Sequence, residues 1–226
     1  AALGTYPVTK GVPKLRSAIA GFVSRRFGLQ GVNPDTEVLP VNGTREALFM
    51  IALAAVPETK NGQKPVVLMP NPFYQVYLGA AVMAGAEPVF VPAGKNNGFL
   101  PDFAALPEDT LKRAVLAYYC SPANPQGAIA SMDTMKSLVG LARDHDFLLV
   151  SDECYSELYY GAPPTGAAEA CVAMGGSLEN VAIMNSLSKR SSVKSIQDIR
   201  EFTSSKKKLM RHVRIESRRR LIIISK

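Results

Sequence analysis

A lysine among small hydroxyl residues is the group in this sequence best suited to covalent chemistry. Residues 185–192 read NSLSKRSS and follow an apolar, strand-like run over 181–184, which places Lys189 just beyond a strand. If its amine were buried there, desolvation would lower its pKa and make it a nucleophile toward a carbonyl group. We therefore expect a buried, reactive Lys189, although a lone lysine also fits a solvated surface charge.

A second segment has the composition of an anion site. Residues 42–46 read NGTRE, follow the largely apolar residues 38–41, and open an apolar helix over 47–56. Gly43 permits close backbone approach and Thr44 offers a hydroxyl group. The start of a helix also presents unpaired N–H groups, which suits a phosphate. A plain N-cap explains Thr44 equally well.

Two loops that follow strand-like runs carry side chains suited to holding a ring. Asn124 lies in the turn SPANPQG (121–127), and Asp152 follows the apolar run 147–150. In a parallel sheet, residues at the carboxyl ends of strands face the ligand crevice. A carboxylate there can keep a heterocyclic nitrogen protonated, and Tyr155 could reach a phenolic oxygen on the same ring. The alternatives are a structural turn around Asn124 and a helix cap at Asp152.

An aromatic residue opens the helix expected after the strand 66–69. Tyr74 lies in NPFYQVY (71–77) and could stack on a planar cofactor. Such aromatic residues more often belong to a core, so Tyr74 supports the other signals without carrying a conclusion of its own.

The elements that must position these residues alternate between short apolar runs and helical patterns. This alternation predicts an α/β fold with three layers, α/β/α, around a mostly parallel sheet. A long surface connection is expected over 92–109. The expected strands are 66–69, 88–91, 114–120, 147–151 and 181–185, and the expected helices are 14–27, 45–55, 74–84 and 132–145.

Composition limits the class of protein. With 226 residues and 47% hydrophobic content, the chain can bury a substantial core. The three cysteines have no metal-type spacing, so we expect no metal site and a reduced, cytoplasmic compartment. The longest apolar run is too short to cross a bilayer and no signal peptide is visible, so no membrane partner is expected.

The net charge of +7 is concentrated in residues 193–226, which hold eleven lysine and arginine residues against three acidic ones. Residues 1–192 are close to neutral. A basic run can bind nucleic acid, but a solvated or disordered segment is the interpretation we favour. After Ser192 the sequence contains no glycine or proline and its charge balance becomes strongly positive. A frame-shifted or otherwise foreign tail is therefore a third possibility.

Together, the five segments match the needs of one cofactor: a phosphate cradle, partners for a pyridine nitrogen and a phenolate, a stacking ring and a lysine. In this combination and order, residues 1–193 resemble the fold-type I, pyridoxal-phosphate-dependent class I/II aminotransferases. The resemblance implies that residues 1–192 are the large domain of such an enzyme. It rests on the phrases NGTREALF (42–49), PNPFYQ (70–75), DECYSELY (152–159) and SLSKRS (186–191).

The resemblance implies a role for each of these residues. Lys189 would bind pyridoxal phosphate covalently and then move a proton between the substrate α-carbon and the cofactor. Asp152 would pair with the pyridine nitrogen, and Tyr155 with Asn124 would hydrogen-bond the ring hydroxyl oxygen. Tyr74 would stack on the ring. The phosphate would be held by Gly43, Thr44, the backbone of Arg45, Ser186 and, from the neighbouring subunit of a homodimer, Tyr6.

The chain departs from the family pattern in three places. Gln126 replaces a threonine of the family's Asn-Pro-Thr-Gly turn. Gln197 stands where the family has a basic residue that contacts the phosphate, and Arg200 lies three positions further on. The small domain, whose arginine binds the substrate carboxylate, has no counterpart in this sequence, and a bidentate arginine is difficult to replace.

The expected activity is amino-group transfer from an amino acid, glutamate first, to a keto acid. Within the family the quoted phrases resemble the branch that acts on N-succinyl-2-amino-6-ketopimelate in lysine and diaminopimelate biosynthesis. Two alternatives remain open: an inactive truncated fragment, and a non-catalytic pyridoxal-phosphate- or ligand-sensing domain of a regulator. The second needs a helix-turn-helix segment, and the sequence shows no signal for one.

Overall fold

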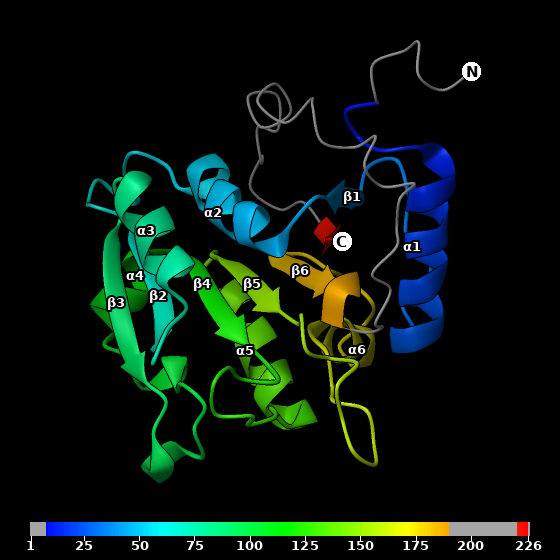
Figure 1. Cartoon of the computed structure of the whole chain (residues 1–226). Helices are drawn as coiled ribbons and strands as arrows, with labels where there is room; N and C mark the ends of the chain where they lie inside the picture. The colour runs from blue at the N-terminus through cyan, green and yellow to red at the C-terminus, as the bar shows by residue number, and fades with distance from the viewer. Residues whose placement is uncertain (1–7, 190–220, 226) are drawn as a thin grey trace.

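A seven-stranded sheet forms the centre of the computed structural model, which describes residues 8–189 and 221–225 (Figure 1). Every neighbouring pair of strands is parallel, and the strand order is β1-β7-β6-β5-β4-β2-β3. The strands are β1 (Val38–Val41), β2 (Val66–Asn71), β3 (Glu87–Pro92), β4 (Ala114–Cys120), β5 (Leu148–Asp152), β6 (Val181–Ser186) and β7 (Leu221–Ser225).

The helices follow from local signals in the sequence. Ser131 caps the amphipathic α5 by accepting a hydrogen bond from the Thr134 N–H group, and α1 begins at Pro13 and ends at Gly28 in the left-handed conformation. In the described part of the chain, no helix has the length and apolar character needed to cross a membrane. The helices are α1 (Pro13–Phe27), α2 (Thr44–Ala55), α3 (Gln75–Met83), α4 (Glu108–Arg113), α5 (Met132–Asp144) and α6 (Ala167–Ala173).

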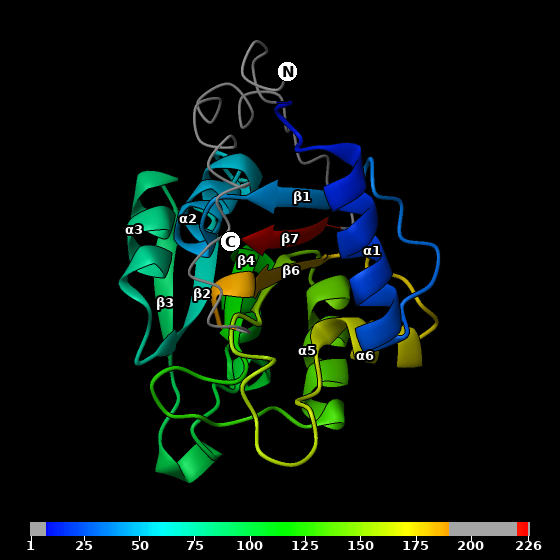
Figure 2. The same cartoon turned by 45° about the vertical axis from the view of Figure 1, so that its right-hand side comes forward.

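Helices cover both faces of the sheet, so the molecule has three layers. Figure 2 shows α1, α5 and α6 on one side of the sheet and α2 and α3 on the other. Alternate residues along each strand enter the two cores: Tyr119 and Ile183 pack with α1, α5 and α6, whereas Tyr118 and Met184 pack with α2 and α3. The expected α/β/α architecture with a mostly parallel sheet is confirmed.

The expected elements are present, with ends that differ by a few residues. Sequence patterns missed two short helices, α4 and α6, because six or seven residues give too few turns to establish a helical period. The connection expected over 92–109 includes two single-turn 3₁₀ helices, η2 (Lys95–Asn97) and η3 (Phe103–Ala105). It ends where α4 begins.

The strand β7 comes from the segment expected to form a basic tail outside the domain. Its five residues lie between β1 and β6 and pair with both in parallel register. The run Leu-Ile-Ile-Ile is strongly β-forming, and Ile222, Ile223 and Ile224 are buried on the two faces of the sheet. Residues 193–220 and 226 lie outside the described residues, so the nature of that part of the tail stays a prediction.

The connections define where a ligand crevice forms. The neighbouring strands β2 and β4 lead into helices on opposite faces: α3, which follows β2, packs on one face, and α5, which follows β4, packs on the other. The chains therefore diverge at the carboxyl ends of β2 and β4. In open parallel sheets this switch point is where ligands bind.

Candidate active site

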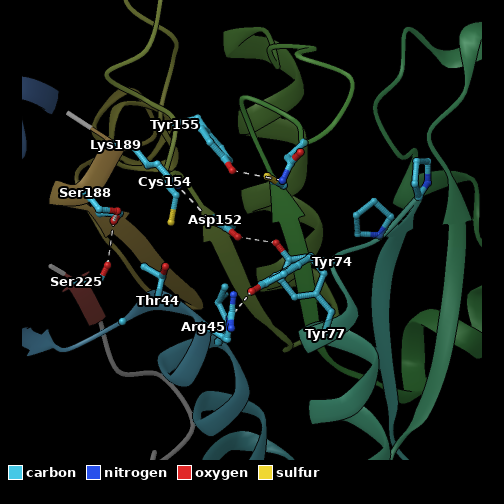
Figure 3. Close-up of a pocket in the computed structure, with 17 residues that line it drawn as sticks. Thr44, Arg45, Tyr74, Tyr77, Asp152, Cys154, Tyr155, Ser188, Lys189 and Ser225 are labelled. Carbon is cyan, nitrogen blue, oxygen red and sulfur yellow. Dashed lines mark hydrogen bonds between the residues drawn. The ribbon is translucent and has the colours of Figure 1, made fainter. Parts of the chain in front are cut away.

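A cavity of about 370 Å³ lies at the carboxyl ends of the strands, at this switch point. Figure 3 shows its lining, in which side chains from β5, β7, the turn after β6 and the start of α2 face one another. A volume of this size is typical of a small-molecule site. The cavity is lined by Gly43, Thr44, Arg45, Leu48, Pro70, Pro72, Tyr74, Tyr77, Cys120, Asn124, Asp152, Cys154, Tyr155, Ser186, Ser188, Lys189 and Ser225.

The start of α2 has the features of an anion site. Gly43 is the N-cap residue and no side chain caps the helix, so the alternative role of Thr44 as a plain N-cap is wrong. Gly43 has φ −157°, which any residue adopts, so its glycine is not required by the backbone conformation. The carboxylate of the exposed Glu46 lies over the helix start, where an added Cβ on Gly43 would meet it. An anion bound at these N–H groups would take the place of that carboxylate.

Three serine hydroxyl groups lie together on the adjoining wall. Ser186 ends β6, and its Oγ lies 2.8 Å from Ser188 Oγ in the single-turn 3₁₀ helix η4 (Leu187–Lys189). Ser225 ends β7 and donates a hydrogen bond to Ser186 Oγ over 3.1 Å. Hydroxyl groups of this kind can donate to phosphate oxygens.

Asp152 ends β5 and is nearly buried, with 6% of its surface exposed. Its Oδ1 accepts a hydrogen bond from the Cys154 backbone N–H group over 3.3 Å, and its Oδ2 accepts one from the Tyr77 hydroxyl group over 2.6 Å. No helix begins within the next ten residues, so the alternative role of Asp152 as a helix cap is wrong. Burial first, and the charge of Asp152 second, raise the pKa of Tyr77, so the phenol keeps its proton.

Asn124 and Tyr155 come from different loops and meet at the cavity. Asn124 Nδ2 donates a hydrogen bond to Tyr155 Oη over 3.3 Å. Burial, and after it the neighbouring Cys120 and Asp152, raise the pKa of the Tyr155 phenol. Asn124 and Tyr155 therefore lie close enough together to hydrogen-bond the same ring oxygen of a ligand, as the sequence predicted.

Lys189 lines the cavity at the end of η4, directly after β6. Its predicted place beyond a strand is confirmed, but its predicted burial is wrong, since the residue is exposed. The turn of η4 carries it past the buried end of the strand. Its Nζ lies 5.7 Å from the centre of the Tyr155 ring, within the range of a cation–π contact.

Tyr74 lies at the N-cap of α3 and lines the cavity half-buried. Its hydroxyl group accepts a hydrogen bond from Arg45 Nε over 2.8 Å, which links the start of α3 to the start of α2. Tyr6 lies outside the described residues, and its role at a neighbouring subunit stays a prediction.

Sequence reasoning missed several residues of the lining. Tyr77 lies three positions after Tyr74 on α3, and this spacing could have placed it on the same face. Ser188 lies within the quoted lysine motif, whereas no sequence signal placed Ser225 at a site. Cys120 and Cys154 also line the cavity, and burial raises the pKa of both thiols, which keeps them in the less reactive form.

The lining fits pyridoxal phosphate. It combines an amine, a buried carboxylate, a phenol–amide pair and an uncapped helix start with hydroxyl groups. Directly before Gly43, both side-chain polar atoms of Asn42 are buried without a hydrogen-bond partner. Among residues 8–189 and 221–225, no group of three or more His, Cys, Asp or Glu residues is arranged to hold a metal ion.

Comparison with known proteins gives consistent matches. The family model for aminotransferase class I and II matches residues 2–195. LL-diaminopimelate aminotransferase of Dehalococcoides mccartyi is 39% identical over 166 residues, which cover 73% of this chain and 41% of that protein. The chain thus spans about two fifths of the length of the curated relatives it matches.

Solved structures match the fold over most of the described chain. An aminotransferase from Neisseria meningitidis superposes with a TM-score of 0.78 at 39% identity, covering 86% of this chain and 49% of that one. A probable N-succinyldiaminopimelate aminotransferase from Thermus thermophilus gives a TM-score of 0.66 at 27% identity, covering 74% and 43%.

Proposed function

Because this chain belongs to the aminotransferase class I and II family, we propose that its cavity binds pyridoxal phosphate and that the whole protein transfers an amino group from an amino acid to a keto acid. One observation carries the proposal. Lys189, Asp152 and the uncapped start of α2 come from three distant parts of the chain and line a single cavity.

When bound, pyridoxal phosphate supplies a carbon that reacts with amines and a ring that withdraws electrons. Lys189 would hold the cofactor through its Nζ, and its amine would take up the proton that leaves the substrate α-carbon. Asp152 would keep the ring nitrogen protonated, which would strengthen the electron withdrawal. Tyr155 and Asn124 would hydrogen-bond the ring oxygen and fix the orientation of the ring.

The phosphate is held at the other end of the cavity. We expect it to be held by the backbone N–H groups of Thr44 and Arg45 and by the hydroxyl groups of Thr44 and Ser186, since these three residues line the cavity. Arg45 and Lys189 are the positively charged residues among the described lining, and the Arg45 side chain is bound to Tyr74. Hydroxyl and backbone donors therefore provide most of the binding to the phosphate.

The names of the relatives support a diaminopimelate as one substrate, and the family resemblance supports glutamate as the amino donor. The partner keto acid takes the amino group in exchange for its carbonyl oxygen. Two keto acids are candidate acceptors: the one related to LL-diaminopimelate and its N-succinylated counterpart. A homodimer, in which Tyr6 reaches the partner's phosphate, is the assembly we propose.

A spectrum of the purified protein with pyridoxal phosphate tests the cofactor site. We expect a new visible or near-ultraviolet band in the wild type and in Lys95→Ala, an exposed control, and none in Lys189→Ala. Borohydride reduction followed by peptide mass analysis should locate the added mass on Lys189. Absence of the band from the wild type contradicts the proposal.

Turnover is a separate measurement. LL-diaminopimelate and N-succinyl-LL-diaminopimelate are offered as amino donors with 2-oxoglutarate, and glutamate formation is followed. Faster turnover of one donor identifies the substrate branch. Cofactor binding without glutamate formation from any donor would instead support a binding domain that does not catalyse transfer.

A further inference from the structure

Two stacked tyrosines lie beside the cavity between α3 and β4. The rings of Tyr77 and Tyr118 are nearly parallel, at 8°, with centres 4.3 Å apart. Both side chains are fully buried. Their hydroxyl groups have different partners: Tyr118 Oη donates to the Leu48 carbonyl group over 2.6 Å, and Tyr77 Oη donates to Asp152 Oδ2 over the same distance.

The Tyr77 hydrogen bond fixes a carboxylate that would otherwise rotate. Asp152 Oδ1 is held by the Cys154 backbone N–H group and Oδ2 by the Tyr77 phenol, so both oxygens have a donor from a different element. The shorter of the two bonds comes from Tyr77. Because Tyr77 is stacked on Tyr118, its own ring has little freedom to move.

The groups that face Asp152 from the surrounding elements do not compete for this role. Cys120 at the end of β4 and Cys154 and Tyr155 after β5 interact electrostatically with Asp152. Burial is the main cause of a raised pKa in all three, so each is neutral at neutral pH. Their charge therefore does not orient the carboxylate at neutral pH. The Cys154 thiol also hydrogen-bonds Asp152, but a thiol is a weak donor compared with the phenol of Tyr77, which lies 2.6 Å from Oδ2.

We propose that Tyr77 is a positioning residue, which holds the Asp152 carboxylate in the orientation needed to pair with the ring nitrogen of the cofactor. The inference rests on the proposed function, because Asp152 has this role only if pyridoxal phosphate is bound. Tyr118 is equally buried and equally hydrogen-bonded, but it acts on the backbone of α2 and has no such role.

The two tyrosines supply a matched pair of variants. Tyr77→Phe and Tyr118→Phe each keep the stacked ring and remove one buried hydroxyl group. We expect Tyr77→Phe to weaken the affinity for pyridoxal phosphate about tenfold, because a carboxylate that is free to rotate pairs less well with the ring nitrogen. Tyr118→Phe should change the affinity less than about twofold.

The pH dependence of the absorbance of the bound cofactor distinguishes the two roles of Tyr77. It should not change if the Tyr77 hydroxyl group only stabilises the fold. Without the phenol donor, the Asp152 carboxylate is no longer held against the ring nitrogen and keeps it protonated less fully. The ring becomes less positive, which raises the pKa of the nitrogen that joins Lys189 to the cofactor. The absorbance of the bound cofactor changes when this nitrogen loses its proton. The pH midpoint of that change should rise by about one unit in Tyr77→Phe and stay unchanged in Tyr118→Phe. On an Asp152→Asn background, Tyr77→Phe should have no further effect on the midpoint.

Three results would overturn the inference while leaving the proposed function intact: a wild-type midpoint and affinity in Tyr77→Phe, an equal shift in Tyr118→Phe, or an undiminished Tyr77→Phe shift on the Asp152→Asn background. Loss of folding in Tyr77→Phe alone would also overturn it, because the hydroxyl group would then be structural. A wild-type protein with no absorbance band contradicts the proposed function itself.

Discussion

Ser225 and Ser186 are register partners on the parallel strands β7 and β6, and the Ser225 hydroxyl group donates a hydrogen bond to Ser186 Oγ over 3.1 Å. Ser225 also pairs with Val41 of β1, which leads into the helix start at Gly43. Among the described strands, β7 is what joins β1 to the rest of the sheet. The strand β7 therefore connects the helix N-terminus of the cavity to the strand that precedes Lys189.

Removal of the Ser225 hydroxyl group should weaken phosphate binding specifically. In Ser225→Ala we expect a loss of about 1 kcal/mol, roughly fivefold in affinity, for pyridoxal phosphate, and no change for pyridoxal, which lacks the phosphate. Titrations of both compounds followed by absorbance measure the ratio. Ser137→Ala, on the exposed face of α5, is the control, and an equal loss for both compounds would contradict a phosphate contact.

Truncation of a buried residue in β7 should destabilise the whole domain. Ile223 is 2% exposed and packs with α2 and α3, so Ile223→Ala is expected to lower the free energy of unfolding by about 3 kcal/mol. Ile129→Ala, at a 49% exposed position, should cost less than about 0.5 kcal/mol. Urea unfolding measures both. Equal, small effects would show that β7 is not part of the folded domain.

Arg26 anchors the loop between β5 and α6. Its guanidinium group donates to Glu157 over 3.1 Å, to Glu169 over 3.0 Å and to the Pro164 carbonyl group over 3.1 Å, with 13% of the side chain exposed. Arg26→Ala leaves two poorly solvated carboxylates and should cost about 3 kcal/mol in urea unfolding. The exposed neighbour Arg25 supplies the control, and an Arg25→Ala variant as unstable as Arg26→Ala would refute the prediction.

Glu153 should make stability depend on pH. Burial raises the pKa of this carboxyl group from 4.5 to about 7, against hydrogen bonds from Ser151 and the Ala167 N–H group that favour its charged form. Between these two values the folded state holds the proton that the unfolded state has lost. Stability therefore falls as pH rises from about 4.5 to 7, by up to about 3 kcal/mol.

A Glu153→Gln variant isolates this contribution, because the amide oxygen can still accept from Ser151 and Ala167. We expect the variant to be more stable than the wild type at pH 8 and similar to it at pH 4.5. Urea unfolding at both pH values measures the difference. Parallel pH profiles for the two proteins would show that Glu153 does not titrate in this range.

Local patterns in the sequence predicted much of the fold and of the site. Apolar runs with a period of two or near four identified most strands and helices, since their residues interact mainly with near neighbours. The polar residues that follow those strands, Asn124 and Asp152, were correctly expected at one edge of the sheet, because parallel strands place their carboxyl ends together.

Other features depended on contacts between distant segments. The exposure of Lys189 depends on the turn of η4, and the hydrogen bond from Tyr77 to Asp152 joins residues 75 positions apart. No local pattern states which buried tyrosine contacts which carboxylate. Local sequence likewise does not decide whether Thr44 and Asp152 cap helices, because this depends on where the neighbouring helices begin.

The sequence by itself determined the family, the layer architecture and the identity of the reactive groups, because these depend on residue types and on short-range periodicity. Only the tertiary structure decided that the final apolar run inserts between β1 and β6, that Ser225 therefore reaches the cavity, and that Tyr77 holds Asp152. The physical reason is that strand order and side-chain partners are set by the packing of the whole sheet, which residues far apart in the chain create together.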